Sequence, residues 1–287
     1  MYKVWLVTGS ASGLGRAIAE EALAAGDQVV ATARDPQQLA DLRERYGDQV
    51  RVAALDVTDQ QAAIAAVQLA VDEFGRLDVV INNAGYGHIA PFEQTSAADF
   101  TAQIDTNFFG VVNVSRAAVP VMRAQRSGHI IQVSSVGGRM GTPGLSAYQA
   151  AKWAVGGFTE VLAQELTPLG IKVCALEPGG MRTNWGPRAS QHIPQLWPEY
   201  EASVGGLLAL LKPHIGHENS DPARIAQVVL RLAYHDAPPA HLLLGSDALQ
   251  YAGLVEADRA AAGERWRAVS ATADATETGP IPPLPLH

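Results

Sequence analysis

The sequence is poor in cysteine, in aromatic side chains and in long apolar runs, and each shortage excludes a class of protein. A single cysteine excludes an intramolecular disulfide framework and a zinc site built from paired thiolates. Cys174 lies in the apolar run 171–176, so we expect it to pack in the core and not to act as a nucleophile. We predict no metal site.

No apolar run approaches the roughly 20 residues that a membrane span needs. The first residues enter a strand pattern at once, without the apolar core and cleavage site of a signal peptide. The net charge is -8, and no basic cluster offsets it, which argues against nucleic acid as a partner. We therefore expect a soluble, cytoplasmic protein with neither a membrane nor a nucleic acid as partner.

Short apolar runs alternate with segments of helical period. Most runs are continuous in Val, Ile, Leu and Ala, which is typical of strands covered on both faces. We expect strands at 4–8, 28–32, 50–55, 77–82, 129–134, 172–177 and, as a seventh, 241–244. We expect helices at 14–25, 36–46, 59–74, 99–124, 146–168 and 221–235. This alternation predicts an α/β fold, a doubly wound parallel sheet of seven strands with helices on both faces, in one domain over 1–277.

The expected helix ends carry typical capping residues. Asp35 and Thr58 are candidate N-caps, and Gly26 and Gly170 are candidate terminators. Two other stretches break the alternation. Residues 184–220 form a proline- and tryptophan-rich insertion, and the tail 278–287 holds four prolines, so it cannot continue a helix. The tail is either a frayed terminus or a subunit contact.

A glycine-rich turn follows the first expected strand, in the sequence Thr-Gly-Ser-Ala-Ser-Gly-Leu-Gly at 8–15. Gly9, Gly13 and Gly15 allow a sharp turn and a close backbone approach to a pyrophosphate, which the N-terminus of the next helix would face. The alternative is a strand–helix joint without a ligand.

The second expected strand ends at Ala33, where a site for NAD usually places a carboxylate. Arg34 follows instead, and a guanidinium can bind a 2′-phosphate with two hydrogen bonds. We therefore favour NADP(H) as cofactor, with NAD(H) as the alternative. Arg34 as a solvated surface residue is the other interpretation, and Asp35 suits a helix cap better than a ribose contact.

Tyr148 and Lys152 lie four residues apart in an expected helix, so their side chains point to the same side. A phenol is a poor base at neutral pH because its ordinary pKa is near 10. We expect the Lys152 ammonium to lower the pKa of Tyr148, so that the pair exchanges a proton with a carbonyl or alcohol oxygen.

Ser135 and Asn107 complete the candidate catalytic set. Ser135 follows an apolar strand, at the edge where open α/β sheets bind ligands, and its hydroxyl could bond the substrate oxygen. It could also be a plain turn serine. Asn107 falls on an apolar helix stripe, where a buried amide must be hydrogen-bonded. It either braces a backbone carbonyl or holds a water that links Lys152 to solvent, and both roles are compatible.

Together these residues resemble the short-chain dehydrogenase/reductase family over nearly the whole chain. The glycine turn resembles its cofactor loop, Asn82-Asn-Ala-Gly85 its sheet-stabilising loop, and Pro178-Gly-Gly-Met-Arg-Thr183 its nicotinamide segment. Asn107, Ser135, Tyr148 and Lys152 match its catalytic tetrad. The resemblance implies a Rossmann-type fold and cofactor contacts by Gly9, Ser10, Ser12, Gly13, Leu14, Gly15, Arg34, Asp56, Val57, Asn83, Ala84, Gly85, Tyr148, Lys152, Pro178, Gly179 and Thr183.

The resemblance also implies a role for each catalytic residue: Tyr148 as general acid/base, Ser135 orienting the substrate oxygen, Lys152 binding the nicotinamide ribose, and Asn107 supporting a proton relay. One departure is Ala151, where many members have serine, and we expect no loss of chemistry from it. Members usually form dimers or tetramers through the two long helices expected here at 99–124 and 146–168.

The insertion 184–220 resembles the family's substrate lid, and an irregular surface loop is the alternative. Residues that could line the substrate pocket, each equally compatible with plain loop or core packing, are His88, Met140, Leu145, Trp185 and Trp197. We predict an NADP(H)-dependent oxidoreductase acting on a ketone or secondary alcohol of apolar, medium-sized character. The rivals are an NAD(H)-dependent alcohol dehydrogenase of the same family, an epimerase or dehydratase, and a dinucleotide-binding sensor without turnover.

Overall fold

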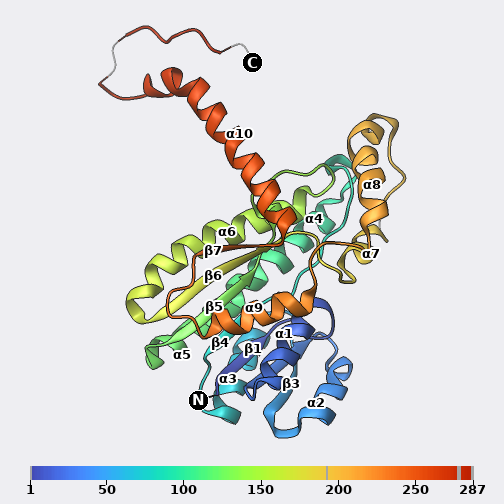
Figure 1. Cartoon of the computed structure of the whole chain (residues 1–287), viewed down its shortest axis with the longest axis vertical. Helices are drawn as coiled ribbons and strands as arrows, with labels where there is room; N and C mark the ends of the chain where they lie inside the picture. Colours follow the sequence, from blue (N-terminus) through green and yellow to red (C-terminus); the bar gives the residue numbers. More distant parts are fainter. Residues whose placement is uncertain (1, 192, 277–278, 286–287) are drawn as a thin grey trace.

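The centre of the protein is a seven-stranded parallel sheet in the order β3-β2-β1-β4-β5-β6-β7 (Figure 1). The computed structural model describes residues 2–191, 193–276 and 279–285. The strands are β1 (Val4–Val7), β2 (Gln28–Ala33), β3 (Val50–Ala54), β4 (Val79–Asn82), β5 (Gly128–Val133), β6 (Ile171–Pro178) and β7 (His241–Leu244). The predicted fold class and all seven strands are confirmed.

The helices cover both faces of the sheet. One face packs against α1 (Gly13–Ala24), α2 (Ala40–Tyr46) and α9 (Pro222–Ala233), with Ile18, Leu42 and Val229 in the core. The other face packs against α3 (Gln60–Phe74), α5 (Gly110–Gln125) and α6 (Ser146–Leu166). The remaining helices are α4 (Ala97–Ile104), α7 (Trp185–Ser190), α8 (Gly206–Leu211) and α10 (Ser246–Ala271). Two apolar cores therefore enclose the sheet.

The strand order explains where a ligand site can form. The sheet grows outward in both directions from β1 and β4, which are hydrogen-bonded neighbours with fully buried residues. The chain leaves β1 toward one face and β4 toward the other, so the connections diverge at the carboxyl ends of these strands. In open α/β sheets, the crevice at this switch point is where ligands bind.

Three predicted helix details need correction. The N-cap of α3 is Asp59 and not Thr58, because the Asp59 carboxylate accepts from the N–H groups of Gln61 and Ala62. The predicted helix at 36–46 begins as a 3₁₀ turn, Pro36–Leu39, which Asp35 caps as expected. The predicted single helix at 99–124 is divided into α4 and α5 by a π-helical turn at Asp105–Phe109.

The last helix was not expected from the sequence. Figure 1 shows α10 leaving the sheet near β7 and projecting away from the body, with the tail beyond it. None of the helices in the described residues is long and apolar enough to cross a membrane. The predicted boundary between domain and tail at 277/278 lies outside the described residues, as do Met1, His192, Leu286 and His287.

The insertion at 184–220 is partly helical. It contains α7 and α8 and lies at one side of the carboxyl edge of the sheet (Figure 1). Its residues Ala189 and Val204 are buried against Ile89 and Leu145 of the main body. The alternative of an irregular surface loop is therefore wrong for this part of the insertion.

Candidate active site

The glycine turn is a backbone cradle at the N-terminus of α1. Gly9 and Gly13 have positive φ angles of 69° and 60°, which side chains other than glycine rarely adopt. A Cβ at Gly15 would collide with the amide of Asn83 and the carbonyl of Gly9. Ser12, the N-cap of α1, makes no side-chain capping bond, so the first N–H groups of α1 keep no side-chain partner there. A pyrophosphate fits this donor set.

The 82–85 loop, which follows the neighbouring strand β4, holds the glycine turn in place through hydrogen bonds. The Thr8 hydroxyl accepts from the N–H groups of Asn83 (2.9 Å) and Ala84 (3.0 Å). The Asn83 amide donates to the Thr8 carbonyl at 2.8 Å. The Asn83 side chain therefore supports the cradle itself and faces its backbone.

Arg34 lies directly after β2, as predicted, and is exposed. Its charge helps to lower the pKa of Asp56, although the larger cause is the hydrogen bonds that the Asp56 carboxylate accepts from Thr58. Arg34 and Asp56 thus lie near each other at the ends of β2 and β3. Val57 is buried against Gly110, where a Cβ would come within 2.5 Å of it.

The four predicted catalytic residues come from three segments that meet beside this cradle. Ser135 lies just after β5, while Tyr148 and Lys152 lie in the first two turns of α6. The Ser135 side chain hydrogen-bonds Tyr148 and also accepts from the N–H of Gly137 at 3.0 Å. Lys152 is buried, and its Nζ lies 5.6 Å from the centre of the Tyr148 ring.

Asn107 is fully buried in the π-helical turn between α4 and α5. Its amide nitrogen donates to the carbonyls of Tyr86 and Gln103, both at 2.8 Å, and its oxygen accepts from the Tyr86 N–H at 3.2 Å. A Cβ at Gly85 would lie 2.5 Å from this oxygen and 3.7 Å from Lys152 Nζ. The first interpretation of Asn107, a brace for the backbone, is therefore confirmed, and the same contacts place it close to Lys152.

The pKa values of Tyr148 and Lys152 differ from the expectation. Burial raises the pKa of Tyr148 to about 12, against a smaller lowering by the Ser135 hydrogen bond. Burial also lowers the pKa of Lys152 to about 8. The Lys152 ammonium points to the Val133 carbonyl, to which it donates at 2.7 Å, and not to the phenol oxygen. In this state desolvation outweighs any lowering of the Tyr148 pKa by Lys152.

The lid covers Tyr148 with apolar side chains. The Trp185 and Tyr148 rings lie 5.1 Å apart at 52°. Leu145, which we predicted in the pocket, is buried with Ile89 of the main body and Val204 of the lid. No sequence pattern singled out Ile89 or Val204, because their contact joins segments more than a hundred residues apart.

The structure records other contacts for the remaining three predicted pocket residues. His88 Nδ1 lies 2.8 Å from an oxygen of Asp99, at the start of α4. The Met140 carbonyl accepts from the Trp153 indole at 3.5 Å. Trp197 is 46% exposed and stacks at 6.4 Å on Tyr200.

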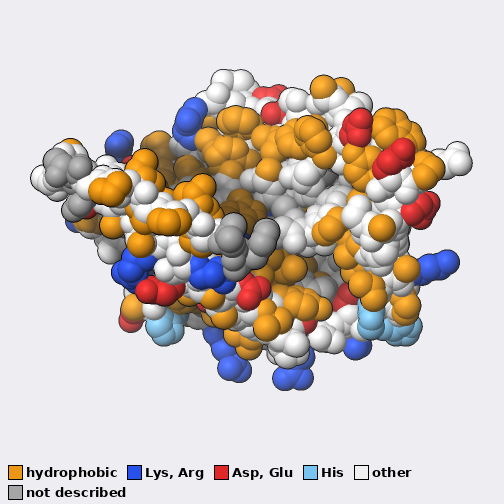
Figure 2. Space-filling model, turned by 90° about the horizontal axis from the view of Figure 1, so that it is seen from above, with side chains coloured by type: hydrophobic (Ala, Val, Ile, Leu, Met, Phe, Trp, Pro, Cys, Tyr) orange, Lys and Arg blue, Asp and Glu red, His pale blue; other side chains and the backbone are white. Residues whose placement is uncertain are grey.

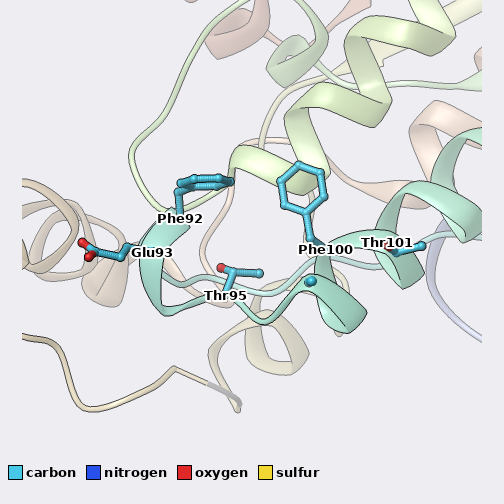
Figure 3. Close-up of a pocket in the computed structure, with 6 residues that line it drawn as sticks. Phe92, Glu93, Thr95, Phe100 and Thr101 are labelled. Carbon is cyan, nitrogen blue, oxygen red and sulfur yellow. The ribbon is translucent and has the colours of Figure 1, made fainter.

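An open groove of about 410 Å³ lies outside the catalytic set, beside the start of α4. Figure 3 shows the Phe92 and Phe100 rings that line it, 6.0 Å apart and nearly perpendicular. The lid is attached next to it, since the Tyr200 hydroxyl donates to the Glu93 carboxylate at 2.6 Å. Figure 2 shows hydrophobic side chains exposed over much of the upper face of the molecule, around a hollow.

Comparisons with known proteins agree with this geometry. Residues 3–193 match the family model of the short chain dehydrogenases. A protein named Oxidoreductase BOA17, from Botryotinia fuckeliana, is 51% identical over 271 residues, which cover 94% of this chain and 98% of that protein.

Two solved structures are similar over most of their length. A short-chain dehydrogenase from Streptomyces avermitilis is 36% identical with a TM-score of 0.87, covering 96% of this chain and 100% of that one. ElxO, solved with NADP bound, is 26% identical with a TM-score of 0.73, covering 87% of this chain and 100% of that one. This chain, with its glycine turn and its Tyr148/Lys152 pair, belongs to the short-chain dehydrogenase family of oxidoreductases.

Proposed function

We propose that this protein is an NADP(H)-dependent reductase that converts a ketone on an apolar, medium-sized substrate into a secondary alcohol. The observation that carries the proposal is the half-buried Tyr148, whose hydroxyl hydrogen-bonds Ser135 and which lies beside the buried Lys152. A phenol with a pKa of about 12 keeps its proton at neutral pH. It is therefore ready to donate that proton to a carbonyl oxygen, which is the requirement of reduction.

Ser135 and Lys152 have separate tasks in this scheme. The Ser135 hydroxyl bonds Tyr148 and would share the substrate oxygen with it, stabilising negative charge as it develops. Lys152 donates one N–H to the Val133 carbonyl, so two donors of its ammonium remain for ribose hydroxyls. Asn107 holds the Tyr86 backbone, which keeps the 85–87 segment against Lys152 and Tyr148.

The chain's residues fit a dinucleotide. The cradle at 9–15 would bind the pyrophosphate, Arg34 a 2′-phosphate and Thr183 the nicotinamide end. Thr183 lies against the cradle, because a Cβ at Gly13 would be 3.5 Å from the Thr183 Cβ. When bound, NADPH supplies the hydride that the carbonyl carbon accepts.

The choice of an apolar substrate rests on the surroundings of Tyr148. Trp185, Leu145, Ile89 and Val204 give the substrate apolar neighbours and exclude water from the proton transfer. A charged substrate would lose its hydration there without compensation.

Replacing Tyr148 with phenylalanine tests the proposal. Tyr148→Phe removes the proton donor and keeps the ring that packs on Trp185, so we expect turnover to fall at least about 100-fold with unchanged NADPH affinity. NADPH consumption across a panel of apolar ketones would be followed at the nicotinamide absorbance band.

Tyr46→Phe is a matched control, since Tyr46 packs against the core far from the cradle in sequence and should keep full activity. Full turnover in Tyr148→Phe would contradict the assignment of the acid. Binding of NADPH by the wild type without consumption on any substrate would instead favour a sensor.

A further inference from the structure

The helix α10 is held to the body by its first half alone. Ala248 and Ala252 are its buried residues, and Gly180 N–H donates to the Asp247 carboxylate at 2.7 Å. Further along, Glu256 pairs with Arg139 at 2.6 Å, and Arg259 stacks on Trp153 at 4.6 Å. Beyond Arg259 the helix continues to Ala271 and projects from the body (Figure 1).

The projecting half, about three turns, lacks the packing that normally stabilises a helix. Helices this short are marginal in water without a packed face. A segment that remains helical over its whole length therefore calls for a partner surface.

One face of α10 supplies such a surface along the whole helix. At spacings of three and four residues, this face, here called the arm face, is formed by Tyr251, Leu254, Asp258, Ala262, Arg265 and Val269. Leu254 is 59% exposed and Tyr251 is 45% exposed. The arm face lies beside the stripe that contacts the body and does not coincide with it.

The arm face carries two charged residues, Asp258 and Arg265. The structure gives Glu256, Arg259, Glu264 and Arg267 a partner each. In the described part of the chain, neither Asp258 nor Arg265 has an ion-pair partner. Opposite charges seven residues apart are separated by about 10.5 Å along a helix, too far to pair with each other.

The pattern of the arm face is self-complementary. If two copies of α10 cross antiparallel with a two-fold axis near Ala262, Asp258 of one copy faces Arg265 of the other, and Leu254 faces Val269. The same contacts then repeat on the other side of the axis, as a two-fold interface requires. Small Ala262 at the axis allows the helices to approach closely.

The superposition on the solved relative from Streptomyces avermitilis reaches into this element. Residues 246–287 make up about a seventh of the chain, so a superposition covering 96% of it includes most of α10.

We infer that the arm face of α10 is an interface between two copies of this chain, formed by antiparallel pairing of their projecting helices. This contact is independent of the proposed reaction. It differs from the two long helices through which the family resemblance implies subunit contacts, now α5 and α6, so it adds a second two-fold contact to any assembly made there.

Charge exchange tests the contact. Arg265→Asp places two like charges opposite each other, so we expect the mass measured by light scattering to fall to half that of the wild type. Asp258→Arg should do the same, and the double variant Asp258→Arg/Arg265→Asp should restore the wild-type mass. An unchanged mass in both single variants, or no recovery in the double variant, would overturn the inference.

A crosslink gives a second reading that does not depend on charge. Cys174 is buried, so a cysteine introduced at Ala262 would be the accessible thiol of each copy. We expect Ala262→Cys to form disulfide-linked dimers under mild oxidation, whereas Ala260→Cys, on the opposite side of the helix, should not. Equal crosslinking of the two variants would refute the antiparallel contact.

Discussion

At the scale of single residues, the active site depends on how burial sets proton affinities. Tyr148 is half-buried and Lys152 is buried, and desolvation moves their pKa values in opposite directions, to about 12 and about 8. Each shift disfavours the charged form of its group. The site therefore keeps the phenol neutral and brings the ammonium closer to losing its proton.

The buried Lys152 should make stability depend on pH in an unusual direction. Its folded-state pKa of about 8 lies below the ordinary lysine pKa of 10.5, so burial costs stability below pH 8, and the cost is relieved as pH rises toward 10.5. The shift corresponds to about 3 kcal/mol. The free energy of unfolding of the wild type and of Lys152→Met would be measured in urea. Between pH 8 and pH 10.5 the wild type should gain stability relative to the variant. A constant difference would mean that Lys152 is well solvated.

Arg34 should select between the two cofactors. It is exposed at the end of β2, and its neighbouring carboxylate, Asp56, is already hydrogen-bonded to Thr58. Because Arg34→Asp replaces a cation with an anion at the expected 2′-phosphate, the Kd for NADPH should rise about 10- to 100-fold. The Kd for NADH, by fluorescence titration, should change little. Arg43→Asp on α2 is the charge-matched control, and equal weakening of both cofactors would show that Arg34 is not the phosphate contact.

At the scale of elements, the close approach of the 184–220 insertion to the 82–88 loop depends on Gly87. A Cβ at Gly87 would come within 2.8 Å of Trp185 and 3.1 Å of Tyr148. The loop therefore needs a residue without a side chain for α7 to lie over Tyr148. The π-helical turn at Asp105–Phe109 acts on the same loop from the other side, through Asn107.

Gly87→Ala should impair the enzyme without unfolding it. The added methyl displaces Trp185 or Tyr148, and small displacements of reacting groups are costly, so kcat/KM should fall at least about tenfold. The melting temperature should change little, because the three atoms nearest to the added methyl belong to side-chain rings and not to the backbone. Gly157→Ala in α6 adds a methyl with no atom within 4 Å and should keep full activity. Equal kinetics for the two variants would show that Trp185 accommodates the added methyl without a loss of activity.

At the scale of the whole molecule, a buried carboxylate joins distant parts of the chain. Asp27, between α1 and β2, accepts from the Lys3 N–H (2.8 Å), the Trp5 indole (2.8 Å) and the Tyr234 hydroxyl (2.6 Å). Tyr234 follows α9, 207 residues further along the chain. This network closes the amino edge of the sheet, opposite the active site.

Asp27→Asn should lower stability and leave the kinetics intact. The new amide group faces a donor, so a buried hydrogen bond is lost, at about 1–3 kcal/mol. Asp236→Asn, at a fully exposed carboxylate, is the control and should be neutral. Thermal unfolding and kcat would be measured for both; a large fall in kcat for Asp27→Asn at unchanged stability would contradict a purely structural role.

Much of this protein could be predicted from its sequence, because the signals are local. Continuous apolar runs indicated the buried strands, and positive-φ glycines such as Gly9, Gly26 and Gly170 marked turns. The spacing of Tyr148 and Lys152 placed both on one side of α6. What the sequence missed is α10, whose apolar residues form no strong single stripe, and the π-helical turn, which the apolar stripe through Asn107 concealed.

The sequence by itself determined the fold class, the position of the glycine turn and the pairing of Tyr148 with Lys152 on one helix, since each depends on residues close together in the chain. Only the tertiary structure decided the pKa values of that pair, the contact of Trp185 with Tyr148, and the free arm face of α10. These depend on which distant segments exclude water from one another, and desolvation is a property of the packed molecule.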